Sequence, residues 1–514
     1  MVPVISRAFE LVTPPRGTHL WARVSRALGR VWFLALLVAV CFVYRFIGSA
    51  GLDEWPVYGS YHDLQADAFL GGHLSLPIEP APELLHAKNP YDTVNANYWW
   101  LDATFYRGKY YMYWGPVPAL CLAVAKWVLG IRHALGDQYV AVAFHCLAFW
   151  CGALVVERML RRLFSSTSRW LLALGTLVVA CANPTPHGVA TASTYQTAII
   201  AAQAWLCAGL IVAFDAVWHA GTPQARWWRL PVAGALLGLA VGSRVSVALA
   251  AGCIALFAAV AEASVAPRHV RRFLVASAWI GAPLAAAGAG LLVYNKLRFD
   301  SYLEFGSKLQ LTWFPMRFSA SYLAANLYSY SLRPGVWSCE FPYLQQVWSM
   351  GEAAFPRGFT RPSDYLVLEP IVGWLRALPI TWLAPFAFLF APRPSSSPRA
   401  RSFFFCLLSF VALASVSGVL PLFVYTGTMR YLADVTCGLV FLGLLGAFSL
   451  GFHRFGAASP RAAWTLIGAL AGATIVMGLL LGYQGYNQHF HRFNPALDKK
   501  IVHALSLCHS PALP

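Results

Sequence analysis

Long apolar runs recur along almost the whole chain, and they constrain its fold more than any other feature. Many of them reach about 20 residues, the length that a helix needs to cross the hydrocarbon core of a bilayer. Hydrophobic residues make up 58% of the 514 residues and charged residues only 11%, too few to cover a water-soluble fold of this size. The sequence therefore predicts an all-α polytopic membrane protein.

Basic residues at the start of the chain set the direction of the first crossing. Five arginines precede the first apolar run, which begins at Val31 and has the length of a membrane anchor rather than of a signal peptide. Basic segments next to membrane spans stay in the cytoplasm. We therefore expect residues 1–30 to form a cytoplasmic leader and residues 31–50 to cross outward.

The apolar run at 115–131 decides how many times the chain crosses. It contains Lys126 and precedes Arg132, and a full crossing there would place the basic segment 157–169 outside. We expect this run to form a helix at the outer surface instead, which leaves about eleven spans. The predicted spans are 31–50, 138–156, 170–183, 192–214, 230–243, 245–261, 273–294, 371–391, 402–423, 430–451 and 462–482.

The charges divide between the two sides of this arrangement. The predicted cytoplasmic segments hold 19 Lys and Arg residues and four acids, whereas 15 of the 21 acids fall in two long outer segments. We call these the first long loop (51–137) and the second long loop (295–370). The net charge of +17 thus indicates topology and not a nucleic-acid partner. The transmembrane domain comprises 31–482, and 483–514 form an outer tail.

The cysteines and the common motifs add little. Nine of the eleven cysteines lie in or beside apolar runs, where a thiol behaves as a small apolar side chain. Cys339 and Cys508 fall in outer segments, and an oxidising compartment permits a disulfide between them, although the sequence favours two separate thiols. The sequence contains no CxxC, HExxH, P-loop or dinucleotide-binding motif.

Carboxylates in the first long loop alternate with Tyr and Trp residues that can line a sugar-sized cleft. We expect a short helix over 61–70, on which Asp63 is either a helix cap or a catalytic group. Asp67 repeats the charge one turn later, which costs stability unless a cation or a proton compensates. Asp102 has no helix to cap and is surrounded by aromatic residues, so we favour a functional role. Asp53 and Glu54 are either site residues or a solvated pair at a helix end, and for Glu54 we favour the second.

Arginines near span ends are the candidate anion ligands. Arg244 lies between two short apolar runs, and an intramembrane arginine indicates function unless it snorkels to the interface. Arg430 begins a span on the outer side, followed by Tyr431, with Asp434 one turn deeper as its partner. A purely structural ion pair is the alternative for that pair.

The second long loop is too long for a simple connector. Its acids Glu304 and Glu369 are either site residues or members of a helix cap or hairpin. No metal-ligand motif is present, so no cofactor is required by the sequence, and a divalent metal stays an open alternative.

Several motifs resemble those of a group of bacterial multispanning glycosyltransferases. These are ADAFLGGHLSL (66–76), NPYD (89–92), DATFYRGKYYMYWGPVPAL (102–120), GLAVGSR (238–244), YNKLRFDSYLEFGSKLQLT (294–312), LEPIVG (368–373) and RYLAD (430–434). The architecture of that group is similar to that of the C-type glycosyltransferases, such as protein O-mannosyltransferases and the aminoarabinose transferase of lipid A. Those enzymes carry an acidic pair soon after the first span, as at Asp53-Glu54, and then a Lys/His-Pro-Pro element. The corresponding segment here, 114–118, lacks the basic residue.

The resemblance implies transfer of a sugar from a polyprenyl-phosphate donor to a glycan, lipid or protein acceptor, at the outer face of a bacterial inner membrane. The residues fit that chemistry, because one carboxylate base acting on an acceptor hydroxyl predicts inversion, and a lipid-phosphate leaving group needs cations. The candidate bases are Asp63, Asp53, Asp102 and Asp67, and the candidate phosphate ligands are Arg244 and Arg430. Further candidate site residues are Glu54, Glu304, Glu369, Asp434 and Tyr431.

Two other functions remain open at this point. A transporter or flippase of a lipid-linked sugar would place paired acidic and basic residues deep within spans. A non-catalytic envelope assembly component would have the same fold but would lack the catalytic carboxylate. The concentration of acids in the two long loops favours the transferase.

Overall fold

The computed structural model describes residues 19–57, 59–265, 269–345, 355–393, 395–453, 460–486 and 488–508. Most of the predicted leader (1–18) and the end of the predicted tail (509–514) lie outside these residues. The chain divides into two compact units, Met1–Val43 and Tyr44–Pro514. Within the described residues, the first unit contains the N-terminal part of helix α2 (His19–Gly48), and the second contains all later elements.

Eight helical segments among the described residues are long and apolar enough to cross a membrane. A helix suits this environment because it satisfies its backbone hydrogen bonds internally, where lipid offers no partners. Each segment overlaps a predicted span, so the expected all-α polytopic membrane fold is confirmed. The segments are Val31–Gly48, Asp137–Leu163, Thr194–His219, Val245–Ala263, His269–Phe299, Pro398–Leu422, Met429–Phe452 and Arg461–Phe493.

The other three predicted spans correspond to shorter apolar helices. Two of these are α7 (Arg169–Cys181) and α10 (Arg229–Ser243). The third, the predicted span 371–391, is broken into three pieces. Pro379 and Pro385 each begin a new piece, since proline lacks the amide proton that a continuing helix needs. The pieces are α14 (Trp374–Ala377), η7 (Pro379–Leu383) and α15 (Pro385–Leu389).

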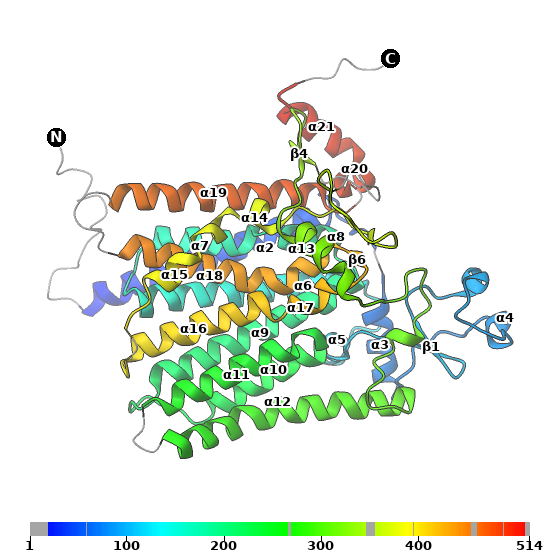
Figure 1. Cartoon of the computed structure of the whole chain (residues 1–514), viewed down its shortest axis with the longest axis horizontal. Helices are drawn as coiled ribbons and strands as arrows, with labels where there is room; N and C mark the ends of the chain where they lie inside the picture. The colour runs from blue at the N-terminus through cyan, green and yellow to red at the C-terminus, as the bar shows by residue number, and fades with distance from the viewer. Residues whose placement is uncertain are drawn as a thin grey trace. The chain divides into compact units, whose positions relative to one another are not determined.

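Helix α9 is central to the helix bundle of the second unit. It packs against α6 and α10, and α10 packs in turn against α12. Helices α16 and α18 pack together, and α19 contacts α7 and α8. Figure 1 shows α9, α10, α12, α16, α18 and α19 running alongside one another. Their bounds are α6 (Asp137–Arg158), η2 (Met159–Leu163), α8 (Thr185–Thr191), α9 (Thr194–His219), η3 (Val245–Val247), α11 (Ala248–Ala263), α12 (His269–Phe299), α16 (Pro398–Ser415), α17 (Val419–Leu422), η8 (Met429–Leu432), α18 (Ala433–Phe452) and α19 (Pro460–Gln484).

The first long loop contains the expected short helix, α3 (Tyr61–Leu70). The apolar run after it forms α5 (Val117–Leu129), which packs against α3 and α10. Between them an antiparallel hairpin turns at Arg107-Gly108, and both turn residues have a positive φ. The other elements of this loop are α4 (Pro82–Leu85), η1 (Thr93–Tyr98), β1 (Thr104–Tyr106) and β2 (Lys109–Tyr111).

The two long loops meet at one end of the bundle (Figure 1). The Leu311 amide donates to the Ala103 carbonyl at 2.9 Å, and the Asp102 amide donates to the Leu311 carbonyl at 2.8 Å. The second long loop also pairs β5 with β6 in parallel, next to the start of α18. Its elements and their partner are η4 (Ser307–Leu309), η5 (Ala320–Tyr322), α13 (Leu323–Ser331), β3 (Val336–Trp337), β4 (Leu344–Gln345), β5 (Leu366–Val367) and β6 (Thr426–Gly427).

A disulfide ties the second long loop to the C-terminal tail. It joins Cys339 to Cys508, although the sequence favoured two separate thiols. The two cysteines are 169 positions apart in the sequence, and they meet because α20 (His489–Phe493) and α21 (Pro495–Leu505) lead the tail back to this loop. The Phe341 amide donates to the Ser506 hydroxyl at 2.9 Å, which closes the same contact.

Single cysteines test whether the two long loops share one side of a membrane. In a cysteine-free background, His86→Cys and Gly358→Cys should both react with an impermeant maleimide added outside intact cells, because both positions are exposed in loops at one end of the bundle. Arg226→Cys, exposed in the connection between α9 and α10 and in a predicted cytoplasmic segment, should react only after permeabilisation. Labelling of only one loop cysteine from outside would overturn the arrangement.

Candidate functional site

Charged and aromatic side chains gather where the two long loops meet the beginning of α18. We call this group the arginine cluster. Its members are linked to one another by hydrogen bonds, ion pairs, ring contacts or electrostatic coupling. They are Asp102, Tyr113, Tyr195, Arg244, Glu369, Arg430, Tyr431 and Asp434.

Asp102 is held by the backbone and by two side chains. It has a φ of 66°, in the left-handed region that Asp tolerates better than most residues. One carboxylate oxygen accepts a hydrogen bond from the Tyr195 hydroxyl, and the other accepts one from the Gln310 amide at 3.2 Å. The side chain therefore points at the start of α9, and its orientation is fixed from α9 and from the second long loop.

Arg430 joins the second long loop to α9. Its Nη1 lies 3.3 Å from Oε1 of Glu369, and its backbone amide donates to Oε2 of the same carboxylate at 3.2 Å. The guanidinium lies 4.0 Å from the centre of the Tyr195 ring, a cation–π distance. Within the described residues, Nε and Nη2 make no hydrogen bond, so two nitrogens keep donors for an anion.

Arg244 lies at the end of α10, where the helix gives way to η3. Its Nε and Nη2 donate to Oδ2 of Asp434 at 3.0 and 2.8 Å, and Nε also contacts the Ser246 hydroxyl at 2.9 Å. Asp434 is fully buried, whereas the Arg244 side chain is 19% exposed. No described residue accepts a hydrogen bond from Nη1 of Arg244, which leaves that nitrogen available.

The ion pairing differs from the prediction. The sequence paired Arg430 with Asp434, one α-helical turn later, but the structure pairs Arg430 with Glu369 and Arg244 with Asp434. The reason is that residues 429–432 form the 3-10 segment η8. A 3-10 helix turns further per residue than an α-helix, so positions four apart no longer lie on one face.

Asp63 and Asp67 form a separate group with Lys126. The Lys126 Nζ atom lies 2.6 Å from a carboxylate oxygen of each. The Leu135 amide donates to the other oxygen of Asp63 at 2.8 Å, and the Asp63 side chain does not cap α3. Burial raises the pKa of Asp63, and the Lys126 ammonium opposes that rise. The cation that compensates the repeated charge thus comes from α5.

Three further candidates lie outside both groups. Asp53 and Glu54 are exposed in the turn after α2, and neither makes a hydrogen bond or ion pair with the described part of the chain. Glu304 accepts the Gly306 amide at 2.7 Å, a local turn contact. The arginine cluster therefore contains six of the eleven residues that the sequence proposed.

The sequence analysis missed three members or supports of the cluster: Tyr113, Tyr195 and Gln310. Tyr195 is the second residue of α9, and an aromatic residue at the end of a span was a usable signal. Tyr113 belongs to the aromatic run before Gly115, and burial together with the nearby Asp102 carboxylate raises the pKa of its hydroxyl. Among the residues that the structure describes, no group of three or more His, Cys, Asp or Glu side chains is placed to hold a metal ion.

Replacing Lys126 tests whether the Asp63 group is structural. Lys126→Met leaves the Asp63 carboxylate buried without its cation, so the free energy of unfolding should fall by about 3 kcal/mol or more, measured by denaturation in mixed micelles. Asp63→Asn in the same chain should restore part of the loss. Lys109→Met, at an exposed position in β2, is the matched control. Unchanged stability of Lys126→Met would contradict the buried ion pair.

Comparison with known proteins gives structural neighbours only. No family model matches the chain, and no curated protein matches it.

The structure is similar to that of ArnT from Cupriavidus metallidurans bound to undecaprenyl phosphate. The two share 13% identity and a TM-score of 0.47, with coverage of 94% of this chain and 82% of that chain. It is also similar to the archaeal oligosaccharyltransferase AglB from Archaeoglobus fulgidus in complex with an inhibitory peptide and a dolichol-phosphate, with 15% identity, a TM-score of 0.44, and coverage of 94% and 60%. The chain thus spans about three fifths of the length of AglB. Both neighbours are C-type glycosyltransferases, the class that the sequence motifs resemble.

Proposed function

We propose that this protein transfers a sugar from a polyprenyl-phosphate donor to an acceptor hydroxyl. The supporting observation is the arginine cluster, in which Tyr195 contacts both the Asp102 carboxylate and the Arg430 guanidinium. Asp102 is linked to Arg430 through Tyr195, and both arginines and Asp102 act electrostatically on Tyr113. At the end of a bundle of membrane-spanning helices, such a group combines a base for the acceptor with cations for the lipid phosphate.

In this proposal the active site lies at the outer face of a bacterial inner membrane. Two independent features support this orientation. Basic residues gather in the predicted cytoplasmic segments, as the positive-inside rule requires. The Cys339–Cys508 disulfide lies in the second long loop and the tail, and structural disulfides persist in oxidising compartments outside the cytoplasm.

Asp102 is the base in this proposal. It is half-buried within the arginine cluster, and its two hydrogen bonds leave lone pairs for an acceptor hydroxyl. Asp63 is enclosed by Lys126 and the Leu135 amide, so its lone pairs are largely used. A single base on the acceptor predicts inversion at the anomeric carbon.

Arg430 and Arg244 bind the donor phosphate. A lipid phosphate is a stable anion once it leaves, so the bond that breaks needs positive charge more than a proton donor. Glu369 and Asp434 hold the two guanidinium groups in place, and the unused nitrogens of each arginine remain for phosphate oxygens. The acceptor oxygen forms a bond to the anomeric carbon while its proton passes to Asp102. The bond between the anomeric carbon and the phosphate oxygen breaks, and its electron pair stays on the lipid phosphate.

A transporter and a non-catalytic assembly component are the alternatives. A transporter predicts charge pairs deep in the spans, but the Arg430–Glu369 pair joins a loop to the first turn of a helix. A non-catalytic assembly component would have the same fold, and a measurement of sugar transfer would distinguish it from an enzyme.

Replacing Asp102 tests the base. Asp102→Asn keeps the shape, and it keeps both neighbours once the Tyr195 hydroxyl or a rotated Gln310 amide accepts from its NH2 group. The basic oxygen is lost, so turnover should fall by at least about 100-fold, with donor affinity and melting temperature unchanged. Asp53→Asn, exposed and without a partner in the described residues, should keep full turnover. Wild-type turnover in Asp102→Asn would remove Asp102 from the role, and loss confined to Asp63→Asn would move the role to Asp63.

Replacing Arg244 tests the phosphate site. Arg244→Lys keeps the charge beside Asp434 but loses the guanidinium fork, so the affinity for bare polyprenyl phosphate should fall several-fold. The double change Arg244→Ala with Asp434→Asn should lower it further without leaving a buried carboxylate unpaired. Arg357→Ala, an exposed arginine of the second long loop, is the control. Equal lipid affinity in all four proteins would leave Arg244 a structural residue.

A further inference from the structure

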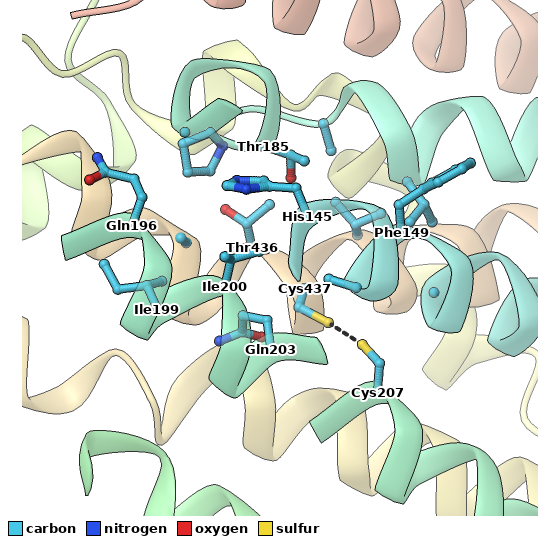
Figure 2. A pocket seen from close by; sticks show the side chains of 18 of the residues that line it. His145, Phe149, Thr185, Gln196, Ile199, Ile200, Gln203, Cys207, Thr436 and Cys437 are labelled. Atoms are coloured by element: carbon cyan, nitrogen blue, oxygen red, sulfur yellow. Dashed lines mark hydrogen bonds between the residues drawn. The ribbon is translucent and has the colours of Figure 1, made fainter. Parts of the chain in front are cut away.

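A cavity of about 80 Å³ lies between helices α6, α8, α9 and α18. Figure 2 shows its polar and apolar side chains converging from these helices. Arg430 belongs both to its lining and to the arginine cluster, so the cavity adjoins the proposed reaction site. The lining residues that carry the argument are His145, Phe149, Gln196, Gln203, Arg430 and Phe441.

Gln203 is the feature of this cavity that needs an explanation. Gln203 is 4% exposed, and neither its amide nitrogen nor its amide oxygen has a hydrogen-bond partner among the described residues. Burying a polar group without a partner is costly, and most buried side-chain polar atoms in folded proteins are hydrogen-bonded. A donor and an acceptor are therefore held in the cavity wall without a protein group to satisfy them.

The position of Gln203 on α9 relates it to the reaction site. Gln196 and Gln203 both line the cavity and are seven residues apart, which places them on one helix face. Seven residues of α-helix rise about 10 Å. Tyr195, which holds Asp102, adjoins Gln196 at the start of the helix. Gln203 thus lies about 10 Å further along α9 than Gln196, the neighbour of the tyrosine that holds the proposed base.

The cavity wall favours a neutral ligand with hydroxyl groups. Gln203 offers a donor and an acceptor. His145 Nδ1 is engaged with the Ala141 carbonyl at 2.8 Å, which leaves Nε2 as its other polar atom. Phe149 and Phe441 supply apolar surface. None of the described lining residues is Asp or Glu, and Arg430 is the one Arg or Lys among them, so a cationic ligand would be buried without a counter-charge.

We propose that this cavity binds the sugar of the lipid-linked donor, with Gln203 as a specificity residue that hydrogen-bonds a sugar hydroxyl. The site accepts an uncharged sugar and disfavours an amino sugar, because none of the described lining residues offers a carboxylate to an ammonium group. This inference rests on the proposed function, since Arg430 at the edge of the cavity holds the phosphate to which the sugar is joined.

Equilibrium binding in detergent tests this with three probes: bare polyprenyl phosphate, the same lipid carrying glucose, and the same lipid carrying an unacetylated amino sugar. The wild-type protein should bind the glucose lipid more tightly than the other two. Gln203→Leu should weaken binding of the glucose lipid by about tenfold, because a buried hydrogen bond to the sugar is lost. Its affinity for bare polyprenyl phosphate should not change.

Two controls keep the result specific. Gln203→Leu removes unsatisfied polar atoms, so its melting temperature should equal or exceed that of the wild type, and Gln203→Met should repeat the binding result with an unbranched side chain. Gln138→Leu replaces another buried glutamine, in α6 and outside the cavity lining, and should leave all three affinities unchanged.

The outcomes separate this inference from the proposed function. Unchanged glucose-lipid affinity in both Gln203 variants, or equal loss for the glucose lipid and the bare lipid, would show that the cavity does not hold the sugar, while phosphate binding by the arginine cluster would stand. Tighter wild-type binding of the amino-sugar lipid would overturn the predicted selectivity. Failure of the wild-type protein to bind any of the three lipids would overturn the proposed function and this inference together.

Discussion

The contact of Arg430 with Glu369 and Tyr195 brings together parts of the chain that are far apart in sequence. Its guanidinium pairs with Glu369 of the second long loop and lies over the ring of Tyr195. The Tyr195 hydroxyl then fixes Asp102 of the first long loop. Removing the arginine would leave a buried carboxylate without its cation and a tyrosine without the charge over its ring. A charge held by two neighbours in this way is oriented before any ligand arrives, which is the condition for efficient electrostatic stabilisation.

The fold was predictable largely because lipid is a demanding solvent. A segment that crosses a bilayer must be apolar and about 20 residues long, so the runs that became α6, α9, α12 and α18 were evident from the sequence. The broken segment at 371–391 was not evident, since its composition is that of a span and only Pro379 and Pro385 indicated the breaks. The disulfide was missed for another reason. The proximity of Cys339 to Cys508 depends on how the tail folds back, and residue spacing does not contain that information.

The candidate site was predictable as a set of residue types but not as a set of partners. The sequence identified Asp102, Arg244 and Arg430, yet it gave more weight to Asp63, whose surroundings were unknown. Lys126 lies 59 residues from Asp67 along the chain, so the ion pair that encloses Asp63 depends on the packing of α5 against α3. The exchange of partners between Arg244 and Arg430 has the same origin, because a short 3-10 segment rotates one side chain away from its expected neighbour. Local patterns indicate which chemistry is present, and tertiary contacts decide which groups meet.

The central claim is that the arginine cluster binds the phosphate of a polyprenyl lipid beside Asp102. The most direct test is an electron cryomicroscopy structure of the protein in nanodiscs with bare polyprenyl phosphate. The account predicts density for the phosphate within hydrogen-bond distance of Arg430 or Arg244, on the side of these two side chains that faces Asp102. A phosphate bound at Lys126, or at the opposite end of the bundle beside Arg158 and Arg162, would contradict it.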